Sequence, residues 1–498
     1  VSVDCGITAI DEASRARELG LDLIITDHHL PGPVLPPAYA IVNPKREDCE
    51  YPEKMLCGAG VAYKIVCALV SSIEAAQMTT QATEKLPVAF PAGYTKWLLD
   101  LVGIATMSDM VPLKGENRLL AYYGLIVLRK TKRPGILSLC RTNMLDPRNI
   151  VEDDIAFTIA PRINVASRLA HPKMAFDLLT SSSFDEAMRI AKDLNNINAR
   201  RKTMVAQIMK QAHAKLREKL CDKEAAFPVI VIGNPDWKPP VLGLVATQII
   251  KAYNKPTLVW GRDESGAYKG SARSTPEIDI VKLMYAAPDE IFINKGGHAQ
   301  SGGFCVHPDH IFDFEEAMLA AYDKAFEKSD GDQDNADADA TDSGEGLDEM
   351  SLNGKGSATG TCYEVDAIIE ARDVNAATFS MIEKLSPCGV GNEKPLFAIK
   401  NFNIKNARLF GKSGEHLELE HGGRDRSGGY GGEFGGLKAI QFFYADGKSG
   451  SAGNEEGSGS ADPLAALKEN RHKAIIGHLE KNQFRGANEI RIKLVGVV

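Results

Sequence analysis

The chain has 498 residues, enough for about three domains with substantial apolar cores. Hydrophobic residues make up 44% of it, and no stretch is expected to be long and apolar enough to cross a bilayer. The formal net charge of −8 looks wrong for a nucleic-acid binder, but residues 330–349 hold nine acids and no Lys or Arg. Without this segment the charge is +1, so a local basic groove is compatible with the composition.

Cysteine usage points to a reducing compartment. The nine cysteines include no Cys-x-x-Cys pair, which argues against a zinc ribbon. Reduced, mostly buried thiols are expected instead, as in a cytoplasmic protein. No membrane partner is expected.

Two neighbouring predicted strands near the start of the chain end in polar side chains. The first carries Asp4, and the second ends in the triplet Asp27-His28-His29. Residues 8–20 between them have helical composition and end in glycine, so the two strands should be parallel in one sheet. Ligands of open α/β sheets bind at the carboxyl ends of strands, so these side chains should share one crevice.

The donor set at this crevice indicates a divalent cation. Carboxylate with imidazole suits Mn²⁺, Fe²⁺ or Zn²⁺, and carboxylate with water suits Mg²⁺. For Asp4 alone, a helix cap or a loop carboxylate remains an alternative.

A third acid fits the same crevice. Residues 94–105 form an apolar helical run that leads to Asp109, the single acid in an apolar stretch before Pro112. A buried lone carboxylate needs a partner, and a metal ion is one. Capping of a helix that begins near Glu116 is disfavoured, because the proline intervenes.

A long helix should follow the first domain, residues 1–175. A capping box at Ser183 and Glu186 opens a helical pattern that continues to about Leu220. Some 37 residues would span roughly 55 Å, so segment 176–222 should bridge two domains. Its Arg and Lys side chains could face a phosphate backbone, although a solvated helix face is the simpler interpretation.

Two further domains are expected after the helix. Residues 223–326 read as a second α/β domain, and 327–360 as a disordered acidic linker. From 361 to 498, short apolar runs alternate with turns, which favours a small OB-like β domain. Gly/Ser-rich stretches at 422–436 and 447–460 should be loops within it.

Two stretches of the second domain have phosphate-binding chemistry. Gly296 and Gly297 would let the backbone approach an anion with its N–H groups turned inward, and His298 adds a donor. Ser271 and Arg273 should lie on one side of a strand, where the guanidinium suits phosphate oxygens.

Three more candidates follow Pro161 in a predicted loop. Arg162, Asn164 and Arg168 could bind the scissile or a neighbouring phosphate. A surface salt bridge is the alternative for each arginine.

The chain resembles a known family at eight motifs. Four in the N-terminal part are similar to successive motifs of the DHH phosphoesterases: VDCGI, ITDHH, IVNPKR and ATMSDMVPL. Four later ones narrow the resemblance to RecJ-type single-strand-specific DNA exonucleases: APRINVASRLAHP, KGSARS, KGGHAQSGGF and LSPCGVGNEKPLF. They occur in the family's order, and the resemblance covers nearly the whole chain outside the low-complexity stretches.

The resemblance implies a fold and a reaction. The fold would be α/β, with a parallel-sheet DHH catalytic domain, a long bridging helix, a second α/β DHHA1-like domain and a C-terminal OB-like β-barrel. The reaction would be 5′-to-3′ hydrolysis of single-stranded DNA with Mn²⁺ or Mg²⁺, in DNA repair and recombination. Single-stranded DNA would be the main partner, with a single-strand-binding protein or a helicase as family expectations.

The resemblance also implies residue roles. Asp4, His28 and Asp109 would hold the metal, with Asp27 in support, and His29 would donate to the phosphate or to the leaving oxygen. The serine–arginine pair of KGSARS would grip the 5′-terminal phosphate. The glycine-rich motif would line the nucleic-acid side of the cleft.

Two further expectations follow from the comparison of motifs. RecJ-like enzymes carry an earlier strand that ends in Asp-x-Asp, whereas this chain begins at Val1 within a strand. We therefore expect that motif upstream of Val1, and the chain by itself to be nearly inactive. The turn at 387–392 has no chemistry of its own and should shape the barrel.

Two rival functions remain. A DHH phosphodiesterase acting on cyclic dinucleotides or short oligonucleotides would end after the glycine-rich motif, so the third domain counts against it. A non-catalytic DNA-binding relative would have no need to keep all the candidate metal ligands.

Overall fold

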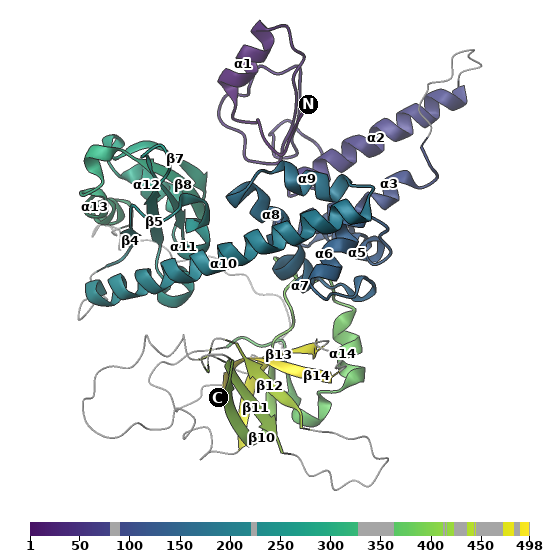
Figure 1. Ribbon diagram of the computed structural model, residues 1–498, viewed down its shortest axis with the longest axis vertical. Coiled ribbons are helices and arrows are strands. Elements are labelled where there is room, and N and C mark those ends of the chain that lie inside the picture. The colour runs from purple at the N-terminus through teal and green to yellow at the C-terminus, as the bar shows by residue number, and fades with distance from the viewer. Residues whose placement is uncertain are drawn as a thin grey trace, which may run out of the picture.

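Three sheets and one long helix organise the molecule (Figure 1). The computed structural model describes, besides residues 414 and 444, the following ranges: 1–79, 90–220, 227–326, 363–411, 416–422, 436–442, 472–482 and 489–497. The predicted acidic linker and nearly all of both Gly/Ser-rich stretches lie outside these ranges.

The first sheet confirms the predicted strand–helix–strand unit. Strands β1 (Ser2–Val3), β2 (Ile24–Thr26) and β3 (Ala40–Val42) are parallel in the order β1-β2-β3, and helix α1 (Ile10–Glu18) connects the first two. The Asp4 N–H donates to the Thr26 carbonyl over 2.8 Å, which keeps the two strand ends side by side.

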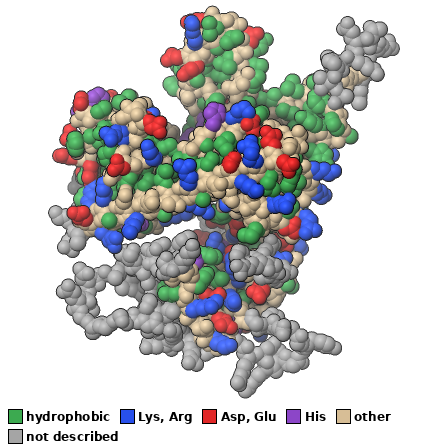
Figure 2. Space-filling view, in the orientation of Figure 1, with side chains coloured by type: hydrophobic (Ala, Val, Ile, Leu, Met, Phe, Trp, Pro, Cys, Tyr) green, Lys and Arg blue, Asp and Glu red, His purple; other side chains and the backbone are tan. Residues whose placement is uncertain are grey.

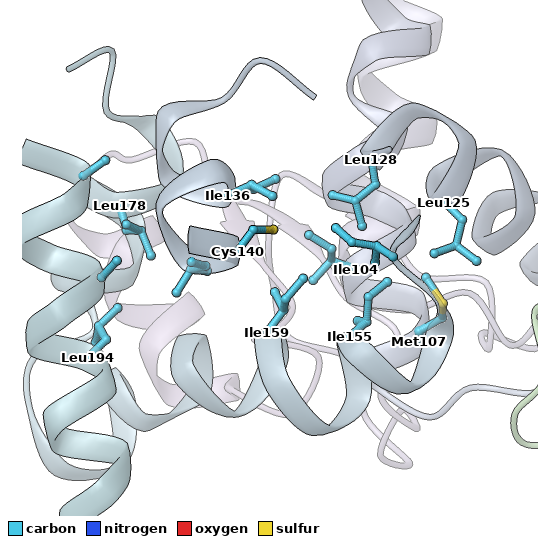
Figure 3. Packing of buried hydrophobic residues seen from close by; sticks show 14 of the residues in the cluster. Ile104, Met107, Leu125, Leu128, Ile136, Cys140, Ile155, Ile159, Leu178 and Leu194 are labelled. Atoms are coloured by element: carbon cyan, nitrogen blue, oxygen red, sulfur yellow. The ribbon is translucent and has the colours of Figure 1, made fainter. Parts of the chain in front are cut away.

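A helical subdomain packs beneath this sheet around the cluster drawn in Figure 3. Its core includes Ile104, Leu128, Ile159 and Leu194, which come from helices far apart in the chain. The helices are α2 (Gly58–Thr79), α3 (Tyr94–Trp97), α4 (Leu99–Ser108), α5 (Gly115–Leu128), α6 (Pro134–Thr142), α7 (Glu152–Asp154), α8 (Ala160–Leu169) and α9 (Lys173–Thr180).

Helices α4 and α5 touch at glycines. A Cβ on Gly103 would lie 2.7 Å from the Gly124 Cα, so only glycine allows this approach. The contact fixes the loop between the two helices, which begins at Asp109.

Helix α2 corrects one sequence expectation. Among the described residues it is the one helix that is long and apolar enough to cross a membrane by length and composition, over Gly58–Gln77. This is weak evidence for a span, because core helices of soluble proteins meet the same test. Val61 of α2 packs in a buried cluster with Leu56, Val102 and Leu120.

The long helix is confirmed as α10 (Phe184–Leu220), 37 residues. The Glu186 N–H donates to Ser183 Oγ over 3.4 Å, as a capping box requires. The Glu186 carboxylate instead accepts from Ser181 Oγ, so only half of the predicted box forms. Figure 1 shows α10 crossing from the helical subdomain to the second sheet.

The second sheet has the order β4-β5-β6-β8-β7, in which only β4 and β5 pair in parallel. Its strands are β4 (Ile230–Gly233), β5 (Thr257–Arg262), β6 (Tyr268–Arg273), β7 (Phe292–His298) and β8 (Ser301–Val306). Helices α11 (Leu242–Tyr253), α12 (Ile280–Ala286) and α13 (Phe314–Phe326) accompany it. The strand expected to carry Ser271 and Arg273 is confirmed as β6.

The third sheet is an OB-like ring. Its order is β11-β12-β14-β13-β10-β9, and β11 also pairs with β10. The elements are β9 (Ala367–Glu370), α14 (Ala376–Glu383), β10 (Phe397–Phe410), β11 (His416–His421), β12 (Lys438–Gln441), β13 (His472–Asn482) and β14 (Glu489–Val497). The long β10 pairs with β13 and β9 in its first half and with β11 in its second half. Register shifts at Ile399/Phe402 and Ile404/Asn406 allow the strand to bend between these partners.

The described cysteines are free thiols, but fewer are buried than the sequence suggested. Cys57, Cys140 and Cys305 are buried, and Cys5 is exposed, because it follows Asp4 at an open strand end.

Candidate metal centre and phosphate-binding surface

Asp4 and His28 face each other at the ends of β1 and β2. The His28 Nε2 atom lies 3.1 Å from Asp4 Oδ1. The Nδ1–H of the same ring donates to the Leu56 carbonyl over 3.1 Å, which leaves Nε2 as the atom directed at the carboxylate. The hydrogen bond with Asp4 raises the pKa of His28 above its usual value, although burial acts in the opposite direction.

Asp109 completes this group from a third element, the C-terminal cap of α4. Its Oδ2 atom lies 3.7 Å from His28 Nε2. Burial raises the pKa of Asp109, and the opposing charges of His28, His29 and Lys45 offset this loss of hydration only in part. A divalent cation bound here would stabilise the charged form of this carboxylate.

Asp27 points away from the crevice and organises its neighbours. Oδ2 accepts from the Ile7 N–H over 2.9 Å, and Oδ1 accepts from the His28 N–H over 2.7 Å. The same Oδ1 lies 2.7 Å from His29 Nδ1. Burial alone would raise the pKa of Asp27, but these hydrogen bonds outweigh it and the pKa is lowered. Both oxygens are thus engaged, and the carboxylate orients the His29 ring.

His29 connects the first sheet to the second. Its ring lies with Asp4 and His28 in a group whose ligand atoms are all within 4.8 Å of one another. It also stacks on His298, with ring centroids 6.1 Å apart and an interplanar angle of 12°. Burial lowers the pKa of His298, and the nearby His29 and Lys45 lower it further. A histidine of β7 therefore faces the candidate metal centre.

The glycine-rich motif forms a hairpin rather than the predicted cradling turn. Gly296 pairs with Gly303 and Gly297 with Gly302 in β7 and β8, and His298 lies at the tip. A Cβ on Gly296 or Gly303 would meet no atom within 4 Å. These two glycines therefore leave bare backbone open to a ligand.

Sequence reasoning missed Lys45 and Asn43. The buried Asn43 side chain donates to the His29 carbonyl over 2.9 Å and accepts from the Lys45 N–H over 2.8 Å. Burial lowers the pKa of Lys45, whereas Asp109 and Asp27 raise it, so a half-buried ammonium lies close to the carboxylates. Both residues belong to the motif IVNPKR. Its polar side chains directly after an apolar run are the sequence feature that could have identified them as site residues.

Gly58 was also missed. It begins α2, and a Cβ at this position would overlap the Asp4 carboxylate. Asp4 has a φ of 65°, in the left-handed region. This backbone conformation sets the direction of its side chain, which lies next to Gly58 at the start of α2.

Ser271 and Arg273 converge on the N-terminal turn of α11. A Cβ on Gly243 would lie 2.9 Å from Arg273 Nη2 and 3.5 Å from Ser271 Oγ. The glycine leaves room for an anion where helix N–H groups are unpaired. Arg168 joins them, because its Nη1–H donates to the Pro240 carbonyl just before α11.

Arg162 and Arg168 lie on helix α8, which corrects the prediction of a loop. A π-helical turn, Ile155–Ile159, accommodates the helix start so that Pro161 falls in its first turn. Asn164, on the same helix, is exposed.

Arg201 and Lys202 of α10 extend this basic group. Arg201 is half-buried, whereas Lys202 is exposed, as the solvated-face interpretation expects. Burial and the proximity of Arg168 lower the pKa of Arg201, and burial with Arg162 lowers that of Lys202. Within the described ranges none of these cations, nor Arg273, has an acid within 4.0 Å. Figure 2 shows Lys and Arg side chains spread over the face crossed by α10. An anion would relieve the mutual repulsion.

Family comparisons agree with this architecture. The DHH family N-terminal domain matches residues 1–90, the DHHA1 domain matches 226–324, and the RecJ OB domain matches 365–496. The three matches cover the three sheets in chain order.

Curated relatives narrow the assignment. The single-stranded-DNA-specific exonuclease RecJ of Bacillus subtilis is 32% identical over 84% of this chain and 47% of its own length. RecJ of Haemophilus influenzae is 30% identical over 84% of this chain and 67% of its own length. The chain thus spans about half to two thirds of these relatives. The chain belongs to the RecJ family.

Solved structures support the same fold. RecJ from Thermus thermophilus in complex with Mn²⁺ has a TM-score of 0.68 and 25% identity, over 100% of this chain and 61% of that one. Another exonuclease RecJ bound to manganese has a TM-score of 0.50 and 29% identity, over 65% of this chain and 74% of that one.

Proposed function

We propose that this chain forms the catalytic part of a metal-dependent exonuclease that degrades single-stranded DNA from the 5′ end, in DNA repair and recombination. The observation that carries the proposal is the convergence of Asp4, His28 and Asp109 beside the His29–His298 stack. The names of the relatives support the reaction class. The RecJ OB match at 365–496 disfavours a small-molecule phosphodiesterase.

Asp4, His28 and Asp109 would hold the cation, and the donor set fits Mn²⁺ or Mg²⁺. Oxygen ligands with one imidazole suit Mn²⁺, and oxygen ligands with water suit Mg²⁺. Such an ion would lower the pKa of a water molecule and offset charge on the phosphoryl group.

The histidine side chains would act on the phosphate itself. Asp27 orients His29 through Nδ1, so that the Nε2 side of the ring would contact the phosphate or the leaving oxygen. His298 would approach the same group from the hairpin, with the backbone of Gly296 and Gly297 beside it.

The second phosphate site would hold the strand end. Ser271 and Arg273 would bind the 5′-terminal phosphate at the start of α11, with Arg168 beside them. Arg162 and Asn164 of α8 would bind neighbouring phosphates.

We also propose the domain division, location and partners. Domains would end near residues 175, 222, 326 and 360. The free thiols favour a reducing, cytoplasmic location. A single-strand-binding protein or a helicase is proposed as partner from the family resemblance, and copurification with the tagged protein would test it.

Protein expressed from its complete gene tests the reaction. Oligonucleotides with a 3′ label should be shortened from the 5′ end as single strands in the presence of Mn²⁺ or Mg²⁺, and chelation should stop the reaction. The same sequence in duplex form should resist. Equal rates on both forms, or release of nucleotides from the 3′ end first, would contradict the proposal.

A further inference from the structure

The turn of residues 385–394 does not belong to the OB-like ring that it precedes. It lies between α14 and β10 in the chain, but its backbone contacts the loop between α4 and α5. The Leu113 N–H donates to the Val390 carbonyl over 2.7 Å. Residues more than 270 positions apart therefore share a backbone hydrogen bond next to the candidate metal centre.

The turn is held rigidly from its other side. The buried Glu152 of α7 accepts from Ser386 Oγ over 2.9 Å and from the Cys388 N–H over 3.1 Å. Within the turn, Asn392 Nδ2–H donates to the Leu385 carbonyl and to the Pro387 carbonyl, over 3.0 and 2.8 Å. A buried carboxylate with two such donors fixes the turn against the helical subdomain.

Two glycines bring the turn into contact with the loop. A Cβ on Gly389 would lie 2.8 Å from Leu113 Cδ1, and one on Gly391 would lie 3.4 Å from Pro112 Cβ. Gly391 has a φ of 73°, which favours glycine in any case, but Gly389 is not in the left-handed region. Its lack of a side chain is therefore explained by the contact with Leu113.

The contacted loop carries Asp109 and contains a strained residue. Met110 follows Asp109 with a φ of 58°, in the left-handed region that residues with a side chain rarely adopt. Such a conformation persists only where the surroundings hold it. The side chains of Val111 and Leu113 are buried, and the Leu113 N–H is hydrogen-bonded to the turn. Together these contacts hold the loop in its conformation.

We propose that the 385–394 turn is a positioning element for Asp109, through which the third domain sets the metal affinity of the first. The inference rests on the proposed function of Asp109 as a metal ligand. Gly389 and Glu152 are positioning residues here, because neither touches the reacting atoms. Residues that orient metal ligands in this way typically change metal affinity by about 10–100-fold when they are replaced.

The experiment compares Mn²⁺ binding by calorimetry and the nuclease rate as a function of Mn²⁺, with protein from the complete gene. Gly389→Val pushes on Leu113, and Glu152→Gln weakens the support of the turn. Each should raise the Mn²⁺ dissociation constant about tenfold. The half-saturating Mn²⁺ concentration should rise equally, while DNA affinity without metal stays unchanged.

Arg408→Met is the control. Arg408 pairs with Glu418 within the third sheet, outside the 385–394 turn. It should leave Mn²⁺ affinity within about twofold of the wild type. If Gly389→Val fails to fold, Glu152→Gln carries the comparison, with circular dichroism as the check.

The outcomes separate the inference from the proposed function. Unchanged Mn²⁺ affinity in folded Gly389→Val and Glu152→Gln proteins would overturn the inference, and so would an equal loss in Arg408→Met. A wild-type protein that binds Mn²⁺ but does not cut DNA would overturn the proposed function alone. The Mn²⁺ dissociation constants of the variants and the wild type would still show whether the turn positions Asp109.

Discussion

His28 has the environment of a metal-ligating imidazole. One nitrogen donates to a main-chain carbonyl and the other faces two carboxylates, which is how proteins orient a histidine ligand. Asp27, the neighbouring acid in the triplet, uses both oxygens on internal donors. Adjacent residues of one motif thus serve different purposes.

His28→Ala should lower the rate of DNA degradation at least about a hundredfold, since it removes a metal ligand. The rate would be measured on single-stranded oligonucleotides over a range of Mn²⁺ concentrations. His310→Ala, on the second domain away from the crevice, is the control and should have no effect. A His28→Ala protein with near-normal rates at every Mn²⁺ concentration would refute the assignment.

Lys45→Met should have opposite effects on metal and on DNA. The ammonium lies near Asp109 and Asp27, so its removal should tighten Mn²⁺ binding about threefold. The same change should weaken DNA binding and slow turnover, because a positive charge near the phosphate is lost. Calorimetry with Mn²⁺ and steady-state rates would test both signs. If both affinities move together, Lys45 acts through structure and not through charge.

Gly58→Ala should weaken Mn²⁺ binding by about 10–100-fold, because its Cβ would displace the Asp4 carboxylate. Gly60→Ala is a matched control in the same turn of α2, where a Cβ would have ordinary contacts of 3.6 Å. Calorimetric titration of both variants measures the difference. Equal Mn²⁺ affinities would show that Asp4 does not bind the metal from its observed position.

At the scale of elements, helix starts and ends position the site. Asp109 ends α4, Gly58 begins α2, and Gly243 lies at the start of α11. Peptide groups are unpaired at helix termini, so side chains and anions find partners there.

Gly243→Ala should reduce the preference for a 5′-phosphate over a 5′-hydroxyl about tenfold, the scale of one hydrogen bond to a charged group. The added Cβ would push Arg273 and Ser271 out of the space above α11. Competition between the two oligonucleotides gives the ratio, and Lys251→Ala at the other end of α11 serves as the control. A preserved ratio in the Gly243→Ala protein would move the 5′-phosphate site elsewhere.

At the scale of the whole molecule, charge is unevenly distributed along the chain. The nine acids of residues 330–349 account for the negative net charge. Among the described residues, the basic group of Arg162, Arg168, Arg201, Lys202 and Arg273 has no acid within 4.0 Å. The net charge of the whole chain therefore says little about the charge at the candidate phosphate-binding surface.

Deletion of residues 330–349 should leave the turnover rate on oligonucleotides unchanged and tighten DNA binding at low salt, because nine negative charges are removed. Fluorescence anisotropy at two salt concentrations would measure the affinity, and the difference should shrink at the higher salt. A folded deletion protein without turnover would show that the segment has a role in the site.

Local patterns in the sequence were sufficient to predict the strand–helix–strand unit, the 37-residue helix and the order of the domains. Hydrophobic periodicity, capping residues and helix-ending glycines depend only on residues close together in the chain. They can therefore be recognised in a single sequence. The metal candidates Asp4 and His28 could also be chosen, because the carboxyl ends of parallel strands meet at one edge. Asp109 could be chosen because it is the single acid in an apolar stretch.

Only the tertiary structure decided what those residues contact. The orientation of Asp27, the nearness of Lys45 and the contact of Val390 with Leu113 depend on backbone donors and neighbours that are distant in sequence. Residues 160–169 form a helix where the sequence predicted a loop. This helix continues from a π-helical turn at 155–159, and helix propensities do not indicate such a turn. The sequence thus determined the chemistry available at each strand end, and packing decided which side chain faces the candidate metal centre and which orients its neighbours.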